Sequence, residues 1–391
     1  MRNWYSNSIN KSILTTNQTL KKSYLWKHFE SIEDPRTSYL IEHKLIDIIA
    51  LTILAVICGA DTWVEIEEYG KSKQSWLHTF LELPNGIPSH DTIARLFARL
   101  SPQQLQSAFI GWINEIAKIS KGEIIALDGK RLRRSYDSSN NQSAIHMVSA
   151  WASQNNLVLG QLKVEDKSNE ITAIPKLLSL LELNGCIVTI DAMGTQVEIA
   201  QMIINQGGDY ILSLKGNQGN LFEDAKQLCE WAFKNNKQDM MGEKYSTIEK
   251  NHGRIEKRRY WLMDSVEDLE DSQRWLGLKS IGIVESSRKI KGKETVERRY
   301  YLTSLEKNVK TFAQGVRSHW GIENKLHWCL DVGFREDESR IRKENSSENM
   351  AIIRHIALNL LNQEKSNRRG KKAKRLKAGW DNDYLLKILS V

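Results

Sequence analysis

The first 120 or so residues have the apolar spacing of helices. Residues 44–60 and 62–81 predict two helices, and another is expected over residues 102–119. Ser89 stands just before a further amphipathic segment, where its side chain suits an N-cap. Residues 48–60 are uncharged and strongly apolar, but they fall short of the roughly 20 residues that a membrane-spanning helix needs. We therefore expect a buried helix in an all-α N-terminal unit of a soluble protein, with no membrane partner.

From residue 123 the pattern changes to short apolar runs separated by turn residues and amphipathic segments. Three successive strands are followed by helix, strand, helix and strand, which predicts an α/β fold with a mixed sheet. The predicted strands are 124–127, 144–152, 157–164, 186–190, 210–214, 257–262, 280–286 and 298–302, and the predicted helices are 171–183, 196–205, 311–328 and 347–361.

Two aspartates stand at the ends of apolar strands. Asp128 follows Ile-Ile-Ala-Leu and precedes Gly-Lys, and Asp191 follows Ile-Val-Thr-Ile and precedes Ala-Met-Gly. A carboxylate at a strand end is open to a ligand while its backbone stays rigid, and hard cations take oxygen ligands. Either aspartate alone is explained as well by a turn or a helix cap. Two such junctions in one chain favour a metal site.

A third feature lies inside the predicted helix 311–328. His319, Glu323 and His327 are spaced i, i+4 and i+8, so at about 100° per residue they share one face of an α-helix. The three side chains suit a zinc cluster of a hydrolase, or simply the polar face of a helix held to a core by its tryptophans. Opposite two strand-end aspartates, Glu323 would instead be the third carboxylate of a site for two Mg²⁺ ions.

Composition limits the class of protein. Hydrophobic residues make up 40% and charged residues 27% of the 391, which excludes a mostly disordered or fibrous chain. The four cysteines are far apart and form no Cys-x-x-Cys pair, so we expect no disulfide framework and a cytoplasmic location. Residues 1–25 lack the apolar core of a secretory signal.

The net charge of +8 is concentrated near the C-terminus. Residues 364–377 hold eight Lys or Arg against one acid, a balance of +7, so the rest of the chain carries about +1. A local basic block suits a polyanion such as nucleic acid, although a solvated tail explains it equally well.

The chain resembles the DDE transposases of bacterial insertion sequences, in the branch of the H-repeat-associated proteins of Rhs elements. The resemblance runs from about residue 28 to 361, and the order and number of its short stretches make it specific. These stretches are Glu-Asp-Pro-Arg (33–36), Pro-Ser-His-Asp-Thr (88–92), Leu-Asp-Gly-Lys (127–130), Lys-Ser-Asn-Glu-Ile (167–171), Thr-Ile-Asp-Ala-Met-Gly (189–194), Lys-Gly-Asn-Gln (215–218), His-Gly-Arg-Ile-Glu (252–256), His-Trp-Gly-Ile-Glu-Asn (319–324), Phe-Arg-Glu-Asp-Glu-Ser-Arg (334–340) and Ile-Ala-Leu-Asn-Leu-Leu (356–361).

The resemblance implies an RNase H-like mixed-sheet catalytic core with a mostly β insertion. Asp128, Asp191 and Glu323 would be the catalytic, metal-binding triad, with two Mg²⁺ ions and Mn²⁺ as a substitute. The expected organisation is an N-terminal extension (1–25), a helical unit expected to bind DNA (26–120), a catalytic domain (121–361) with its insertion at about 215–305, and a basic C-terminal tail (362–391).

The implied activity is transposition: metal-dependent cleavage of DNA strands at the ends of an insertion sequence, followed by strand transfer. The implied partners are the terminal inverted repeats and the target DNA. A dimer is expected on the assembled ends, in the cytoplasm at the nucleoid.

One departure from the family pattern concerns the surroundings of the glutamate. Many related transposases place a Tyr, an Arg and a Lys seven before, four before and seven after it. Here those positions are Val316, His319 and Leu330. The departure bears on how the terminal phosphate is held and on whether a hairpin intermediate forms.

Several other polar side chains are candidates for DNA contact. Four basic residues closely follow the first aspartate, one lysine and one asparagine follow the strand at 210–214, and the rest lie in the insertion or beside the glutamate. Glu170 is read as an acid that stabilises a helix start. The candidates are Lys130, Arg131, Arg133, Arg134, Lys215, Asn217, His252, Arg254, Arg317, His319 and His327.

Two readings compete with an active transposase. The first is a DNA-binding protein derived from a transposase that has lost or changed its catalysis, although all three acids are present. The second is the zinc hydrolase with His319, Glu323 and His327 as ligands.

Overall fold

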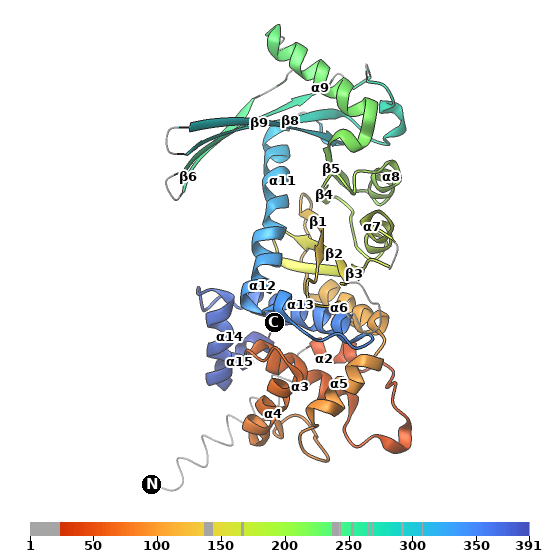
Figure 1. Ribbon diagram of the computed structural model, residues 1–391, viewed down its shortest axis with the longest axis vertical. Helices are drawn as coiled ribbons and strands as arrows, with labels where there is room; N and C mark the ends of the chain where they lie inside the picture. Colours follow the sequence, from red (N-terminus) through yellow and green to blue (C-terminus); the bar gives the residue numbers. More distant parts are fainter. Residues whose placement is uncertain are drawn as a thin grey trace.

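The computed structural model describes residues 24–390 except 137–143, 166–167, 237–241, 243, 252–253, 265, 268, 291–292 and 307. The chain forms an elongated mixed α/β structure, with helices at one end, a large mixed sheet through the middle and a curved β layer at the other end (Figure 1).

The N-terminal part is helical, as the sequence predicts. It contains α2 (Tyr24–Phe29), α3 (Leu45–Ile57), α4 (Trp63–Leu77), α5 (His90–Arg99) and α6 (Pro102–Ile116). Ser89 caps α5 by accepting a hydrogen bond from the backbone of Thr92. The apolar run predicted as a buried helix is α3, in which every side chain from Ile48 to Ile57 is buried. In the part of the chain that the structure describes, no helix combines the length and apolar character needed to cross a membrane.

Helix α13 (Ser346–Gln363) joins the helical part to the sheet. It contacts α3, α5 and α6 on one side and strand β3 (Leu157–Lys163) on the other. Nearly all of its side chains are buried, including polar ones such as Asn349 and Asn359. The helical part and the sheet therefore share one continuous apolar core, which runs from Leu25 to Leu389.

The sheet has nine strands in the order β3-β2-β1-β4-β5-β9-β8-β7-β6. Its first half contains β1 (Ile124–Arg131), β2 (His146–Ala152), β3, β4 (Ile187–Ile190) and β5 (Asp209–Leu214). Strand β1 is antiparallel to β2 but parallel to β4, and β4 is parallel to β5. These five strands match the predicted apolar runs.

The insertion extends this sheet. It contains helix α9 (Gly219–Lys234) and strands β6 (Tyr245–Asn251), β7 (Arg254–Met263), β8 (Ser280–Ile290) and β9 (Lys293–Thr303). Strand β9 pairs antiparallel with β5, so the insertion and the first five strands form one continuous sheet. The sequence pattern indicated β7, β8 and β9 but not β6 or α9.

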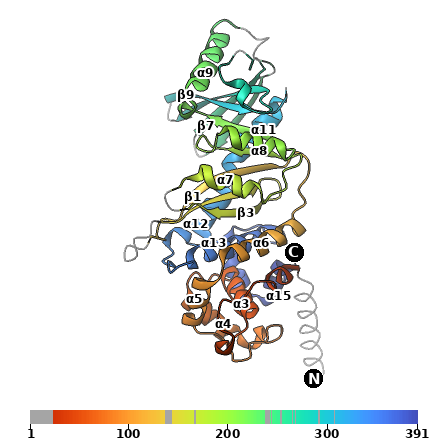
Figure 2. The same ribbon diagram turned by 90° about the vertical axis from the view of Figure 1, so that its right-hand side faces the viewer.

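Helices cover both faces of the first five strands. Helices α7 (Glu170–Leu178) and α8 (Val197–Asn205) lie on one face and α11 (Val309–Gly321) on the other (Figure 2). Gly315 lets α11 approach the sheet closely, because a Cβ atom there would lie 2.2 Å from Ile211 Cδ1. This close contact sets the distance between α11 and the strands that it covers.

The predicted helix 311–328 is interrupted. Helix α11 ends at Gly321, a π-helix covers Ile322–His327, and α12 covers Trp328–Gly333. Because a π-helix has a wider turn than an α-helix, the predicted shared face of His319, Glu323 and His327 is not kept.

The predicted basic tail is a second correction. Helices α14 (Lys371–Trp380) and α15 (Asn382–Leu389) follow α13 and pack on it. Lys374 is buried, donates a hydrogen bond to the carbonyl of Leu361 and pairs with Glu364 at 3.2 Å. The charge of Lys374 is therefore used inside the fold, and this residue is not part of a solvated tail.

Arg375 is also buried and ties the C-terminus to the N-terminal helices. Its guanidinium donates to the carbonyl of Val56 and to Asp61 Oδ1, at 2.9 and 2.7 Å, and lies over the ring of Phe334. The net positive charge of this segment thus overstates what it can offer to a polyanion.

We expect Arg375→Leu to lower the free energy of unfolding by about 3 to 5 kcal/mol, because it leaves the Asp61 carboxylate and the carbonyls of Val56, Ala60 and Gly333 without their buried partner. Lys372→Ala is the control, since Lys372 is exposed on the same helix. Urea unfolding of both variants measures the difference. Equal stability of the two variants would show that the buried pair is unimportant.

Candidate active site

The two aspartates lie side by side, although only Asp191 follows directly on the end of its strand. Asp128 lies inside β1, which continues to Arg131 beyond the predicted end at residue 127, because the added residues pair with β2. In the parallel pairing of β1 and β4, Leu127 stands opposite Ile190, so Asp128 and Asp191 occupy the next position of each strand. Adjacent parallel strands end at the same edge of a sheet, and both side chains line one cavity there. The register of β1 with β4 therefore brings the two carboxylates close together, as a shared metal site requires.

Each aspartate is held by backbone amides. Asp128 Oδ1 accepts a hydrogen bond from the amide of Gly129 at 2.9 Å. Asp191 Oδ1 accepts from Met193 and Gly194, which is also the turn-capping role considered for it. The Asn217 amide donates to the carbonyl of Ala192 at 2.7 Å. Asn217, a candidate for DNA contact, therefore holds the loop that follows Asp191.

Glu323 reaches the same cavity from the π-helix. The cavity has a volume of about 500 Å³ and lies between the ends of β1, β4 and β5, helix α11 and strand β9 of the insertion. Glu323 is exposed at its rim. Three carboxylates, one from within β1, one from the end of β4 and one from the π-helix, thus face a common space.

The negative charge of this cluster affects the pKa of Asp128. Burial, followed by the negative charge of Asp191, raises the pKa of Asp128 to about 7, and Glu170 and Glu323 add to the effect. Desolvated like charges at close range favour a bound cation or a proton.

Glu170 is the residue of this region that the sequence reading missed. It is the first residue of α7, as predicted, but it is buried and its Oε1 pairs with His146 Nε2 at 2.8 Å. A Cβ atom at Gly129 would lie 2.0 Å from Glu170 Oε1, so the pair packs directly on the residue after Asp128. Its only signal in the sequence is the stretch Lys-Ser-Asn-Glu-Ile.

His319 and His327 have separate partners. His319 Nδ1 lies 3.0 Å from Thr189 Oγ1, and burial lowers the pKa of the ring. His327 Nδ1 lies 3.6 Å from Asp128 Oδ2, and burial together with the charge of Lys130 lowers its pKa to about 4. Both rings are neutral at pH 7. His319 still lines the cavity, whereas His327 packs behind Asp128.

Lys130 does not face solvent as a DNA contact would. Its ammonium pairs with Asp331 and with the buried Glu336, and its side chain is 11% exposed. The charges of Lys130 and Arg354 lower the pKa of Glu336 to about 2, although burial alone would raise it. Lys130 is thus neutralised inside the protein, in contrast to the expectation.

The other basic candidates near Asp128 differ among themselves. Arg131 and Arg134 are exposed, while Arg133 is exposed but pairs with Asp337 at 3.2 Å. Lys215 lines the cavity. His252 lies outside the described residues, and the side chain of Arg254 does too.

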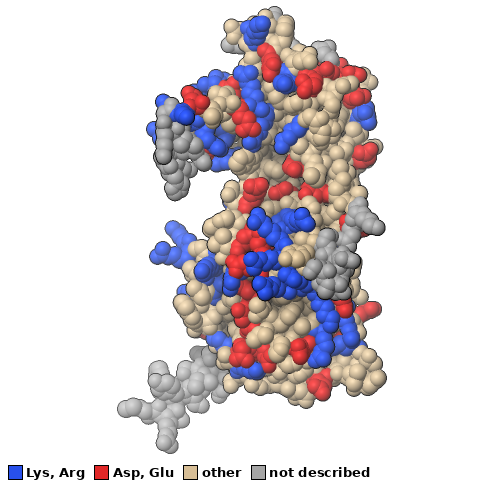
Figure 3. Space-filling view, in the orientation of Figure 1, with Lys and Arg blue, Asp and Glu red and all other residues tan. Residues whose placement is uncertain are grey.

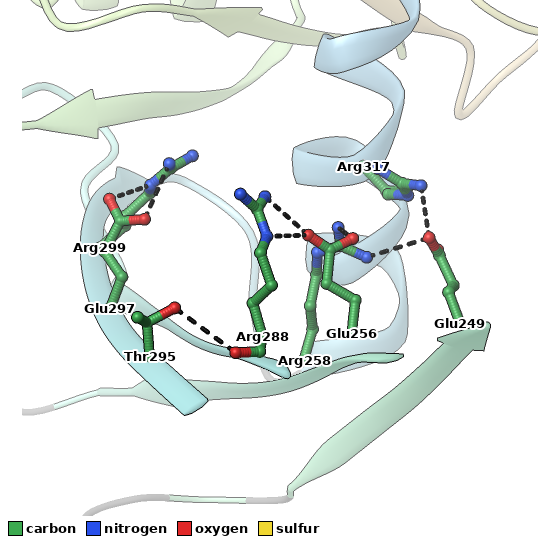
Figure 4. A network of polar contacts seen from close by, with 8 residues as sticks. All are labelled: Glu249, Glu256, Arg258, Arg288, Thr295, Glu297, Arg299 and Arg317. Atoms are coloured by element: carbon green, nitrogen blue, oxygen red, sulfur yellow. Dashed lines mark hydrogen bonds and ion pairs between the residues drawn. The ribbon is translucent and has the colours of Figure 1, made fainter. Parts of the chain in front are cut away.

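Arg317 belongs to a network of charges on the insertion sheet (Figure 4). It donates to Glu249 of β6 at 2.7 Å, and Glu249 also pairs with Arg258. The network ties α11 to the curved sheet, so Arg317 is a structural cation rather than a free one. At the cavity end of the same sheet, Arg299 pairs with Glu297 and lies over the ring of Trp320.

The donor chemistry fits a hard divalent cation, because three carboxylates face one cavity, where burial and then the charge of Asp191 raise the pKa of Asp128. Over the described ranges, however, no three His, Cys, Asp or Glu side chains form a group that could already hold a metal ion. A bound cation would have to draw the carboxylates together. The zinc cluster of His319, Glu323 and His327 gains no support from this geometry.

Comparison with known proteins places the chain in a family. The family model described as "Transposase DDE domain" matches residues 119–360, and one described as "DDE_Tnp_1-associated" matches residues 26–113. A solved structure of the piggyBac transposase in a synaptic complex with hairpin DNA aligns with 94% of this chain and 79% of that chain, at 12% identity and a TM-score of 0.41.

Two relatives are similar over nearly their whole length. The "H repeat-associated putative transposase YhhI" of Escherichia coli K12 is 42% identical over 379 residues, 95% of this chain and 98% of the relative. The "Putative transposase YncI" of E. coli O157:H7 is 43% identical over 94% of each chain. With two aspartates in register on neighbouring strands and a glutamate facing them, the chain belongs to the family of DDE transposases.

Proposed function

We propose that this chain is an active transposase that cleaves DNA at the ends of an insertion sequence and joins the ends to target DNA. The observation that carries the proposal is the register of β1 and β4, which brings Asp128 and Asp191 together in a cavity that Glu323 also lines. The order of the first five strands and their directions support an RNase H-like core.

Asp128, Asp191 and Glu323 would hold the divalent ions, with Mg²⁺ or Mn²⁺ expected because all the donors are carboxylate oxygens. Two such ions supply Lewis acidity and an activated water or 3′-hydroxyl for in-line attack on a phosphodiester. The proposed chemistry needs no covalent intermediate on the protein.

The remaining side chains of the cavity would orient the DNA strand. Lys215 supplies positive charge beside the carboxylates, whereas Arg299 lines the cavity while paired with Glu297. His319 is neutral and tied to Thr189, so it can offer a hydrogen bond but not a charge to a phosphate. The terminal inverted repeats, the target DNA and a dimer on the assembled ends complete the proposal.

The first prediction concerns the triad. Alanine at Asp128, Asp191 or Glu323 should lower nicking of supercoiled plasmid by roughly three orders of magnitude or more, and a double variant should be scarcely worse than a single one. DNA binding in a mobility-shift assay should stay nearly unchanged. Glu198→Ala, an exposed acid on α8, is the control.

Near-wild-type nicking by one variant would remove that residue from the site. If the wild-type protein binds DNA but never nicks it with Mg²⁺ or Mn²⁺, the DNA-binding protein without catalysis is the better reading. Activity lost on removal of stoichiometric zinc would favour the hydrolase.

The second prediction uses stability. Asp128→Asn should raise the melting temperature in EDTA, by an amount equivalent to roughly 1 to 3 kcal/mol, because it relieves repulsion by Asp191 and Glu323. Mg²⁺ or Mn²⁺ at about 100 times its Kd should stabilise the wild type by about 2.7 kcal/mol and the variant much less. Scanning fluorimetry with Glu198→Gln as control checks both. A variant that is stabilised as much as the wild type would contradict the assignment of Asp128.

The third prediction concerns Gly129. Gly129→Ala should cost about 1 to 3 kcal/mol and most of the nicking activity, since its Cβ would collide with the buried Glu170–His146 pair. Gly370→Ala, where nothing lies within 4 Å of the new Cβ, should be neutral. Adding Glu170→Ala to Gly129→Ala should restore part of the stability. Urea unfolding measures all three proteins, and no recovery would show that the clash lies elsewhere.

A further inference from the structure

A band of positive charge links helix α5 with the residues that follow Asp128. Figure 3 shows Lys and Arg side chains gathered across the middle of one face of the molecule and toward α5. The cations come from three segments: Arg95 and Arg99 on α5, Arg340, Arg342 and Lys343 before α13, and Arg131 and Arg134 at the end of β1.

Helix α5 is fixed to the segment before α13. Asn345 donates from its backbone to the carbonyl of Ala98 and from its side chain to that of Leu100, both at 3.2 Å. The buried Asn349 donates to the carbonyls of Phe97 and Leu100 at 2.8 and 2.9 Å. These bonds satisfy the last carbonyls of α5, which a helix end otherwise leaves unpaired. The exposed face of α5 therefore has a fixed place relative to the sheet.

The same segment is fixed to the end of β1. The Arg342 guanidinium donates from Nε to the carbonyl of Arg134 at 2.8 Å and lies 4.9 Å from the ring centre of Tyr136. Strand β1 carries Asp128 three residues before its last residue, Arg131. A chain of direct contacts thus runs from α5 through the segment before α13 to the strand of the first catalytic aspartate.

The cations of this band are available to a ligand. Within the described ranges, Arg95, Arg99, Arg131, Arg134, Arg340 and Lys343 are exposed and make no ion pair. The neighbouring Lys130, Arg133 and Arg335 are instead neutralised by Asp331, Asp337 and Glu338. Among the exposed acids of the three segments, as far as they are described, Asp91 lies 3.7 Å from His90 Nε2 and Glu344 makes no ion pair.

We infer that this band, defined by the seven cations of α5, the segment before α13 and the end of β1, is a composite surface that holds the phosphate backbone of one DNA duplex. The inference rests on the proposed function, because it explains how a duplex held by the helical part is led to the triad. Regularly spaced phosphates match a row of unpaired arginines on rigid elements, and such contacts position a duplex without reading its sequence.

The test compares two pairs of substitutions in the full chain. Arg95→Ala with Arg99→Ala removes the α5 end, and Arg340→Ala with Lys343→Ala removes the middle. Each pair should reduce the slope of log affinity against log salt by about 2, since each phosphate contact contributes about 0.9. Affinity at low salt should fall roughly tenfold for each pair. Lys71→Ala with Lys176→Ala is the control, because both lysines are exposed but already paired with acids.

Binding is measured by fluorescence anisotropy in EDTA, with a short random-sequence duplex and one of its single strands as separate probes, so that no cleavage is needed. An unchanged slope in either pair would overturn the composite surface, and so would a loss confined to single-stranded DNA. Nicking by each variant is then measured at saturating protein. If the wild type nicks DNA but the two double variants keep the wild-type salt slope, the composite surface is refuted and the proposed catalysis is not. If the double variants have reduced salt slopes but the wild type never nicks DNA, the proposed catalysis is refuted and the composite surface is not.

Discussion

The parallel pairing of β1 with β4 is the constraint on which the rest of the site depends. It places two carboxylates next to each other, where burial and the negative charge of Asp191 raise the pKa of Asp128. The protein holds them by backbone amides from Gly129, Met193 and Gly194 rather than by cationic side chains. Among the described residues, no Lys or Arg forms an ion pair with either aspartate, so the two carboxylates favour a bound cation.

The positive charge near the site is divided between two tasks. Lys130, Arg354 and Arg375 are buried and paired with acids or carbonyls, so their charge holds elements together. Arginines and lysines that make no ion pair lie on the outer face of α5, before α13 and at the end of β1, and Lys215 lines the cavity itself. Net charge along the sequence does not separate these two groups, because burial and pairing are decided by residues far away in the chain. Lys130 and Asp331, for example, are 201 positions apart.

The strands of the first half of the sheet could be predicted because each contains a short apolar run. The apolar runs before the two aspartates, together with the family stretches, also indicated that Asp128, Asp191 and Glu323 face one cavity, while their catalytic role stays a prediction. Three features could not be predicted. The π-helix depends on how α11 packs on the sheet, and a search for a period of 3.6 residues in the sequence does not detect it. Glu170 is distant from Asp128 in sequence, and only the fold brings it against Gly129. The basic C-terminal segment reads as solvent-exposed, yet two of its cations meet buried partners around α3 and α13.

The packing of the C-terminal helices on α3 has a consequence for folding during synthesis on the ribosome. Helix α3 is among the first to be synthesised, but its partners include α13 and α14, which come last. Domains generally fold as units during synthesis, N-terminal first. Here the side of α3 that packs on α13 and α14 stays exposed until almost the whole chain has been synthesised. A product that stops early therefore exposes α3 and is a substrate for proteases and chaperones, so the fold itself limits the lifetime of incomplete copies of the protein.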